Sequence, residues 1–79
     1  MKARVYVTLK PDVLDPQGQA IQKACVSLGH DGVSSVRQGK VFDIELATND
    51  RAAAETLVGE LSDKLLANTV IEDFSVELV

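Results

Sequence analysis

The sequence predicts an α+β fold of two layers, a ferredoxin-like, four-stranded antiparallel sheet in the order βαββαβ with two helices on one face. Three observations indicate this class. Apolar and polar residues alternate near both ends of the chain, two segments repeat apolar residues at helical spacing, and two β-rich runs lie between those segments. Because crossover connections are right-handed, both helices are expected on the same face of the sheet.

The first strand is expected over residues 2–10, where every second residue is apolar. A helix follows over Pro16–Leu28. Asp15 can accept free backbone N–H groups at its start, Pro16 fits the first helical position, and Gly29 supplies a left-handed residue at its end. The apolar stripe of this helix has four members: Ile21, Ala24, Cys25 and Leu28.

A hairpin is expected next, from β-rich runs at residues 33–36 and 41–46. The turn between them covers residues 37–40, in which Gly39 can take the positive φ of a tight turn. Residues that face each other across a hairpin share a face of the sheet. Two such pairs are predicted: Ser35 with Phe42, and Val36 with Val41.

The second helix has alternative N-caps at residues 48–50 and is expected to end at Asn68. Its apolar stripe has five members: Ala54, Leu57, Val58, Leu61 and Leu65. Residues 72–79 alternate again, which predicts a fourth strand that completes the sheet.

The composition restricts the classes of function. With 79 residues, the chain is expected to form one domain (residues 1–79), and a core of this size often gains from self-association. A net charge of −4, with one Tyr, two Phe and no Trp, argues against binding of nucleic acid. No segment has the pattern of a signal peptide or a membrane span, and the one cysteine forms no internal disulfide. We therefore expect a cytoplasmic protein.

No catalytic, cofactor-binding or metal-binding residue is predicted. Cys25 and His30 are the only Cys and His, and a nucleophile pair would also need an orienting group. Cys25 fits a small buried hydrophobe and His30 a solvated loop residue. The acidic residues are scattered, whereas a metal needs three or four converging ligands. The glycines match neither a P-loop nor a dinucleotide-binding spacing.

A self-association patch is predicted on the face of the sheet away from the helices. Asp43 and Glu45 cannot point to the core, so strand parity turns Val36 and Val41 outward. The residues that it turns inward are Phe42, Ile44 and Leu46. A few apolar groups among charges are typical of an interaction patch. The predicted patch has four members: Tyr6, Val36, Val41 and Val79.

Three stretches resemble the PurS family, and the resemblance extends over essentially the full chain. They are Val13-Leu14-Asp15-Pro16-Gln17-Gly18, Val36-Arg37-Gln38-Gly39-Lys40 and Val70-Ile71-Glu72-Asp73-Phe74. The first stretch is the most specific, because a capped helix start requires only the Asp-Pro pair. The third departs slightly from the family pattern, which often has Pro where Thr69 stands.

The resemblance implies a non-catalytic assembly subunit of phosphoribosylformylglycinamidine synthase. Such a subunit joins a PurQ-type glutaminase to a PurL-type synthetase, and those partners use glutamine and ATP with magnesium. The family also implies a homodimer or higher homo-oligomer. Polar motif residues on turns need a reason beyond folding, so Asp15, Arg37 and Lys40 are candidate contacts with the synthetase.

Two other readings share the order of elements. An ACT-like small-molecule-sensing module has the βαββαβ order, although it usually accompanies a catalytic domain. An acylphosphatase-type enzyme needs an Arg in a Gly-rich turn after the first strand, where this chain reads Lys10-Pro11-Asp12-Val13-Leu14.

Overall fold

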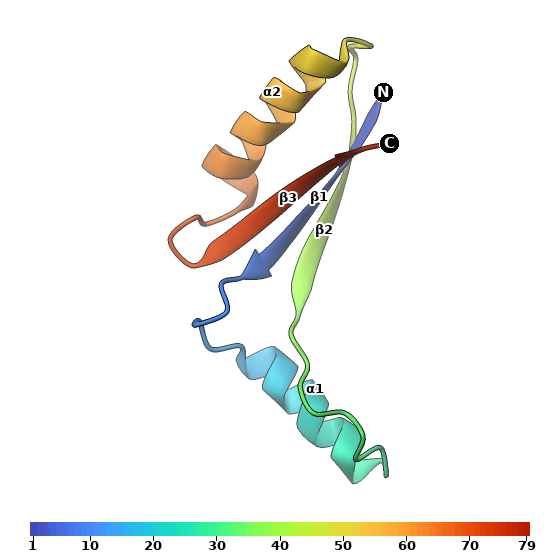
Figure 1. Cartoon of the computed structure of the whole chain (residues 1–79), viewed down its shortest axis with the longest axis vertical. Helices are drawn as coiled ribbons and strands as arrows, with labels where there is room; N and C mark the ends of the chain where they lie inside the picture. Colours follow the sequence, from blue (N-terminus) through green and yellow to red (C-terminus); the bar gives the residue numbers. More distant parts are fainter.

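The computed structural model describes the whole chain, residues 1–79, and contains one antiparallel sheet of three strands. The strand order is β2-β1-β3, so β1 (Lys2–Leu9) lies between β2 (Gly39–Glu45) and β3 (Glu72–Leu78) (Figure 1). In the register, Val5 of β1 is opposite Phe42 of β2 and Val76 of β3. The alternation in β1 and β3 therefore produces one apolar face, as predicted.

The core lies on this inner face of the sheet and is small. Only 9 of the 79 residues are buried, and Val5, Val7 and Val58 are its largest apolar members. The aromatic and aliphatic residues of the two outer strands pack against this cluster but stay partly exposed. Such a limited core leaves most apolar side chains of the chain incompletely covered.

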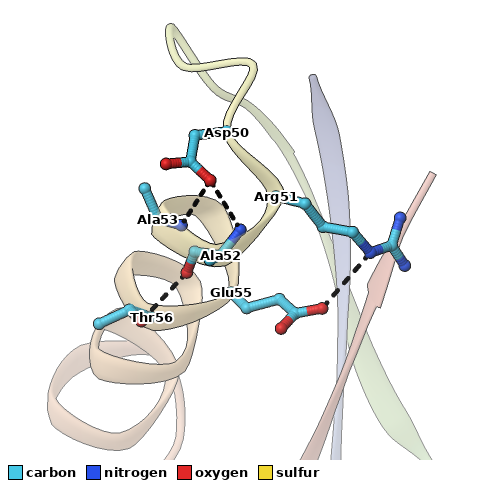
Figure 2. A network of polar contacts seen from close by, with 6 residues as sticks. All are labelled: Asp50, Arg51, Ala52, Ala53, Glu55 and Thr56. Carbon is cyan, nitrogen blue, oxygen red and sulfur yellow. Dashed lines mark hydrogen bonds and ion pairs between the residues drawn. The ribbon is translucent and has the colours of Figure 1, made fainter.

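The helix α2 (Arg51–Leu61) packs on the inner face beside β3 (Figure 1). Its N-cap is Asp50, whose Oδ1 accepts the backbone N–H groups of Ala52 (3.0 Å) and Ala53 (3.5 Å), as Figure 2 shows. Ala54 and Val58, one turn apart, are fully buried. Figure 2 also shows Arg51 paired with Glu55 on the helix surface, at 3.5 Å.

The end of α2 differs from the expectation. The helix continues as a π-helix, η1 (Ser62–Leu66), in which the buried hydroxyl of Ser62 donates to the carbonyl of Val58 (2.7 Å). The wider turn shifts the helical face. Leu65, which lies in this turn, is 74% exposed, and Leu57 of the predicted stripe, which lies before it in α2, is 44% exposed.

The helix α1 (Pro16–Ser27) starts and ends as predicted, because Asp15 caps it and Gly29 follows it with φ of 89°. It does not, however, cover the sheet. Figure 1 shows α1 projecting beyond the end of β1, so the expectation of two helices on one face is wrong. The molecule measures 49 × 25 × 14 Å, and its radius of gyration is 16.0 Å. A compact chain of this length would have a radius of about 11.6 Å.

The prediction of a strand at residues 33–36, and with it of a four-stranded sheet, is also wrong. This segment is extended, but it runs beside α1 and pairs with no strand (Figure 1). The side chain of Gln22 on α1 donates to the carbonyl of Val33 (3.2 Å), in place of a strand neighbour. The predicted pairing of Ser35 with Phe42 and of Val36 with Val41 is therefore absent.

The predicted turn at residues 37–40 is instead a straight entry into β2. Gly39 pairs with Thr8 and Lys40 with Val7, and neither has positive φ. A Cβ at position 39 would lie 2.8 Å from the carbonyl oxygen of Val7. Glycine at this position thus allows β1 and β2 to approach each other closely.

Candidate interaction surfaces

Asp15 connects α1 to a segment far along the chain. Its Oδ1 accepts the backbone N–H of Gly18 (2.9 Å), and its Oδ2 accepts the backbone N–H of Gln38 (2.7 Å). The residue is only 4% exposed. The N–H groups of Gln38 and Gly18, helped by the positive charge of Arg37, hold the pKa of Asp15 below its ordinary value. The carboxylate is therefore charged at neutral pH and bonded to two elements.

Gly18 allows these two elements to touch. A Cβ at this position would overlap the carbonyl oxygen of Val36 and would lie 2.6 Å from Oδ2 of Asp15. The sequence predicts Asp15 as a helix cap, but it indicates neither its bond to Gln38 nor the contact of Gly18 with Val36. The Gln17-Gly18 pair, which belongs to the first family-like stretch, is the only sequence feature that points to a role for Gly18. We call Asp15, Gly18 and Gln38 the Asp15 joint.

The other two candidate partner contacts lie close to this joint. Arg37 donates from Nη2 to the carbonyl of Lys10 (3.0 Å) and shares the lining of a shallow cavity with Asp15. Lys40 lines the adjacent cavity with Asp15 and is paired with Glu72, Nζ to Oε2, at 3.6 Å. The structure thus brings Asp15, Arg37 and Lys40 into one region. Asp15 is buried there, whereas both basic residues remain exposed.

The α1 arm, defined as residues 16–36, carries apolar side chains without cover. Ile21, Val26 and Leu28 are 45%, 47% and 76% exposed. Cys25 is half-buried, so its predicted burial is only partly met, and His30 is exposed as predicted. An exposed apolar stripe on a projecting helix is typical of an interaction surface.

The inner face of the sheet over β2 is the second incompletely covered apolar region. β2 lies on the side of the sheet away from α2 (Figure 1). Phe42 and Ile44 point to this inner face, as predicted, and both are only half-buried. In the expected fold, α1 of the same chain would cover this place. In the structure no helix of the chain covers it.

The outer face of the sheet carries most of the predicted self-association patch. Tyr6 is opposite Val41 in the register, and Val41 and Val79 are 56% and 71% exposed. Val36 does not belong to this face, because it lies on the α1 arm against Gly18. Three of the four predicted members, Tyr6, Val41 and Val79, therefore share the outer face, and their role in self-association stays a prediction.

Charge on the outer face is largely paired within the chain. Nε of Arg4 donates to Oδ1 of Asp43 (2.7 Å), and the hydroxyl of Tyr6 donates to Oε2 of Glu77 (3.0 Å). The hydrogen bond that Arg4 donates to Asp43 raises the pKa of the Arg4 guanidinium. Such exposed, mutually satisfied groups fit a solvated face as well as a partner face.

The chain matches the family model of PurS, described as phosphoribosylformylglycinamidine (FGAM) synthase, over residues 2–79. It is 48% identical over 77 residues to the phosphoribosylformylglycinamidine synthase subunit PurS of Bacillus subtilis, covering 98% of this chain and 90% of that protein. None of the helices is both long enough and apolar enough to cross a membrane.

Solved structures agree with the sequence match. The PurS of Methanocaldococcus jannaschii, one of the subunits of formylglycinamide ribonucleotide amidotransferase in the purine biosynthetic pathway, has a TM-score of 0.87 and 38% identity. That likeness covers 96% of this chain and 92% of the other. A chain of PurLQS from Thermotoga maritima has a TM-score of 0.90 and 26% identity, covering 99% of this chain and 95% of that one.

Proposed function

This chain belongs to the PurS family, and we propose that it is the non-catalytic assembly subunit of phosphoribosylformylglycinamidine synthase in purine biosynthesis. The family match over residues 2–79 carries this conclusion. The likeness to a chain of the Thermotoga maritima PurLQS structure supports the partners. We infer that the chain joins a PurL-type synthetase subunit to a PurQ-type glutaminase subunit in the cytoplasm, where a free cysteine stays reduced.

The chemistry belongs to the partner subunits in this proposal. Glutamine is hydrolysed by the glutaminase, and ATP with magnesium is used by the synthetase. The chain contributes contacts, and the exposed basic residues Arg37 and Lys40 are the candidates for the synthetase side. Charge-assisted contacts of this kind favour acidic groups on a partner.

Reconstitution tests this function. The PurL and PurQ subunits of the same organism are mixed with and without the chain, and glutamine-dependent amidation is measured. We expect the chain alone to show neither glutaminase nor ATPase activity, and the mixture to require it. Full glutamine-dependent activity of the two large subunits without the chain would falsify the proposal.

Self-association is the second part of the proposed function, and the exposed area supports it. The accessible surface is 5582 Å² for a mass of 8.5 kDa. A compact monomer of that mass would expose about 4,650 Å². The excess of about 900 Å² is close to the roughly 800 Å² that each partner buries in an interface of standard size.

We propose that a second copy of the chain covers this exposed apolar surface. No helix of the same chain covers the inner face of the sheet over β2, and the projecting α1 packs on no sheet of the same chain. In two copies related by a twofold axis, α1 of each copy can pack on the inner face of the other. An isologous interface of this kind covers both exposed surfaces in both copies. The homodimer would then restore the two-layer packing that the sequence predicts for one chain.

A further inference from the structure

The direction of α1 needs a physical cause, because burial does not supply one. The helix contributes only Gly18 to the buried residues, whereas α2 contributes Ala54 and Val58. Helices in proteins are normally held by packing of an apolar face, and the apolar face of α1 is exposed. Polar contacts must therefore hold the α1 arm in place.

The Asp15 joint supplies the central contact. Each of the two carboxylate oxygens serves a different element: Oδ1 bonds to α1 through Gly18, and Oδ2 bonds to the entry of β2 through Gln38. The carboxylate that caps α2 differs, because Oδ1 of Asp50 accepts both of its bonds from its own helix (Figure 2). A helix needs only one accepting oxygen at its cap. The second oxygen of Asp15 is thus available to orient the helix.

Further contacts continue this connection on both sides. Toward the tip of the α1 arm, Gln22 donates to the carbonyl of Val33 (3.2 Å). Toward the sheet, Arg37 donates to the carbonyl of Lys10 (3.0 Å), one residue beyond the end of β1. These contacts fasten the arm as one unit and connect it to two strands. Asp15 lies between them and is the only buried member of this polar set.

We propose that Asp15 is a positioning residue, which sets the direction in which α1 leaves the sheet and so presents α1 to a second copy of the chain. The inference rests on the self-association part of the proposed function. The Asp15 side chain is buried, its bond to Gly18 is buried and its bond to Gln38 is partly buried, so two donors hold the charged group in one orientation. An arm without this joint samples many directions, which raises the entropy that binding must remove.

Asp15→Asn separates capping from positioning. Asn is as good an N-cap as Asp, so α1 keeps its cap. Its amide NH₂ is a donor and cannot accept a hydrogen bond, so with the side chain in the same orientation only one of the N–H groups of Gly18 and Gln38 keeps its acceptor. Asp50→Asn in α2 is the matched control, because Asp50 needs only one accepting oxygen. Both variants are made in the full chain.

Two readouts follow the variants. Spin labels at Lys23→Cys and Ser75→Cys, in a Cys25→Ala background and diluted with unlabelled protein, report the distance from α1 to the sheet within one chain. Sedimentation equilibrium reports the dimer dissociation constant. In Asp15→Asn we expect a broadened distance distribution and a dissociation constant raised on the order of tenfold. In Asp50→Asn neither should change.

A narrow distance distribution together with an unchanged dissociation constant in Asp15→Asn would overturn the inference. A broadened distribution with unchanged affinity would overturn the link to self-association. If the unmodified protein is a monomer, the self-association part of the proposed function fails, while the distance measurement still decides whether Asp15 orients α1. Gly18→Ala should broaden the distribution independently, because its Cβ meets the backbone of Val36, whereas Gly59→Ala meets no atom within 4 Å.

Discussion

The two helices of this chain are held in opposite ways. α2 is fixed by burial, since Ala54 and Val58 are fully covered against the inner face of the sheet. α1 is fixed by hydrogen bonds at the Asp15 joint, while Ile21 and Leu28 remain exposed. The difference teaches that one chain completes only half of its two-layer packing. In the dimer that we propose, a second copy of the chain supplies the other half.

The largest effect is expected where burial alone holds a helix. Val58→Asp places a charge in the core without a partner, and it should lower the free energy of unfolding by about 4 kcal/mol or more. Leu65→Asp, a few residues on and 74% exposed, should change it by less than about 0.5 kcal/mol. Chemical denaturation at one protein concentration measures both. Similar losses in the two variants would contradict the packing of α2.

A smaller effect is expected from substitutions on the α1 arm, and it should appear in the dimer dissociation constant. Ile21→Asp exposes no core, but it removes an apolar side chain from the proposed interface. Burial of an Ile contributes roughly 1.5–3 kcal/mol, so the dimer dissociation constant should rise at least about tenfold. Val41→Lys on the outer face is the counterpart, and it tests the patch predicted from sequence. Sedimentation that shows a monomer for Val41→Lys and a dimer for Ile21→Asp would move the interface to the outer face.

Acid should weaken the α1 arm before the core. The pKa of Asp15 is lowered in the folded chain, so its stabilisation is complete above the ordinary value of 3.8 and is lost as pH falls through the folded value. Protonation adds a hydrogen to the carboxylate and removes an acceptor from Gly18 or Gln38. The distance distribution from α1 to the sheet should broaden in the parent protein as pH falls through the lowered pKa of Asp15, which lies below 3.8. An identical pH profile in Asp15→Asn would exclude Asp15 as the cause.

Local signals explain which parts of the fold were predictable. The alternation in β1 and β3, the cap at Asp15 and the left-handed Gly29 act within a few residues, and all were identified correctly. The segment 33–36 was not, because a β-rich run fits an edge strand and an extended segment beside a helix equally well. In the structure, the segment is held beside α1 by its close approach to Gly18 and by the bond from Gln38 to the second oxygen of Asp15.

The candidate site follows the same division. Asp15 was singled out from the sequence because its cap is local, but its bond to Gln38 spans 23 positions and has no local signal. Arg37 and Lys40 were placed on a turn that does not exist, yet the structure still brings both beside Asp15. The projecting α1 arm could not be predicted, because helical periodicity does not say which sheet covers the stripe.

The smallest effect is expected at Gly59, near the end of α2 and before the helix continues as η1. No atom lies within 4 Å of a Cβ built there, and φ is not positive. Gly59→Ala should raise the free energy of unfolding by about 0.5–1 kcal/mol, because alanine favours the helix. Thermal melts at matched concentration measure this gain, and Gly18→Ala in α1 should show a loss. An equal gain in the free energy of unfolding at both positions would contradict the claim that close contacts hold α1 at Gly18 but not α2 at Gly59.

Contacts between copies test most directly whether the α1 arm of one chain packs on the sheet of another. Copies labelled with ¹³C are mixed with unlabelled copies, and isotope-filtered nuclear Overhauser spectra record only contacts between chains. We predict cross-peaks between the methyl groups of Ile21 in one copy and the ring of Phe42 in the other. Cross-peaks confined to Tyr6 and Val41, with none from Ile21, would contradict the account.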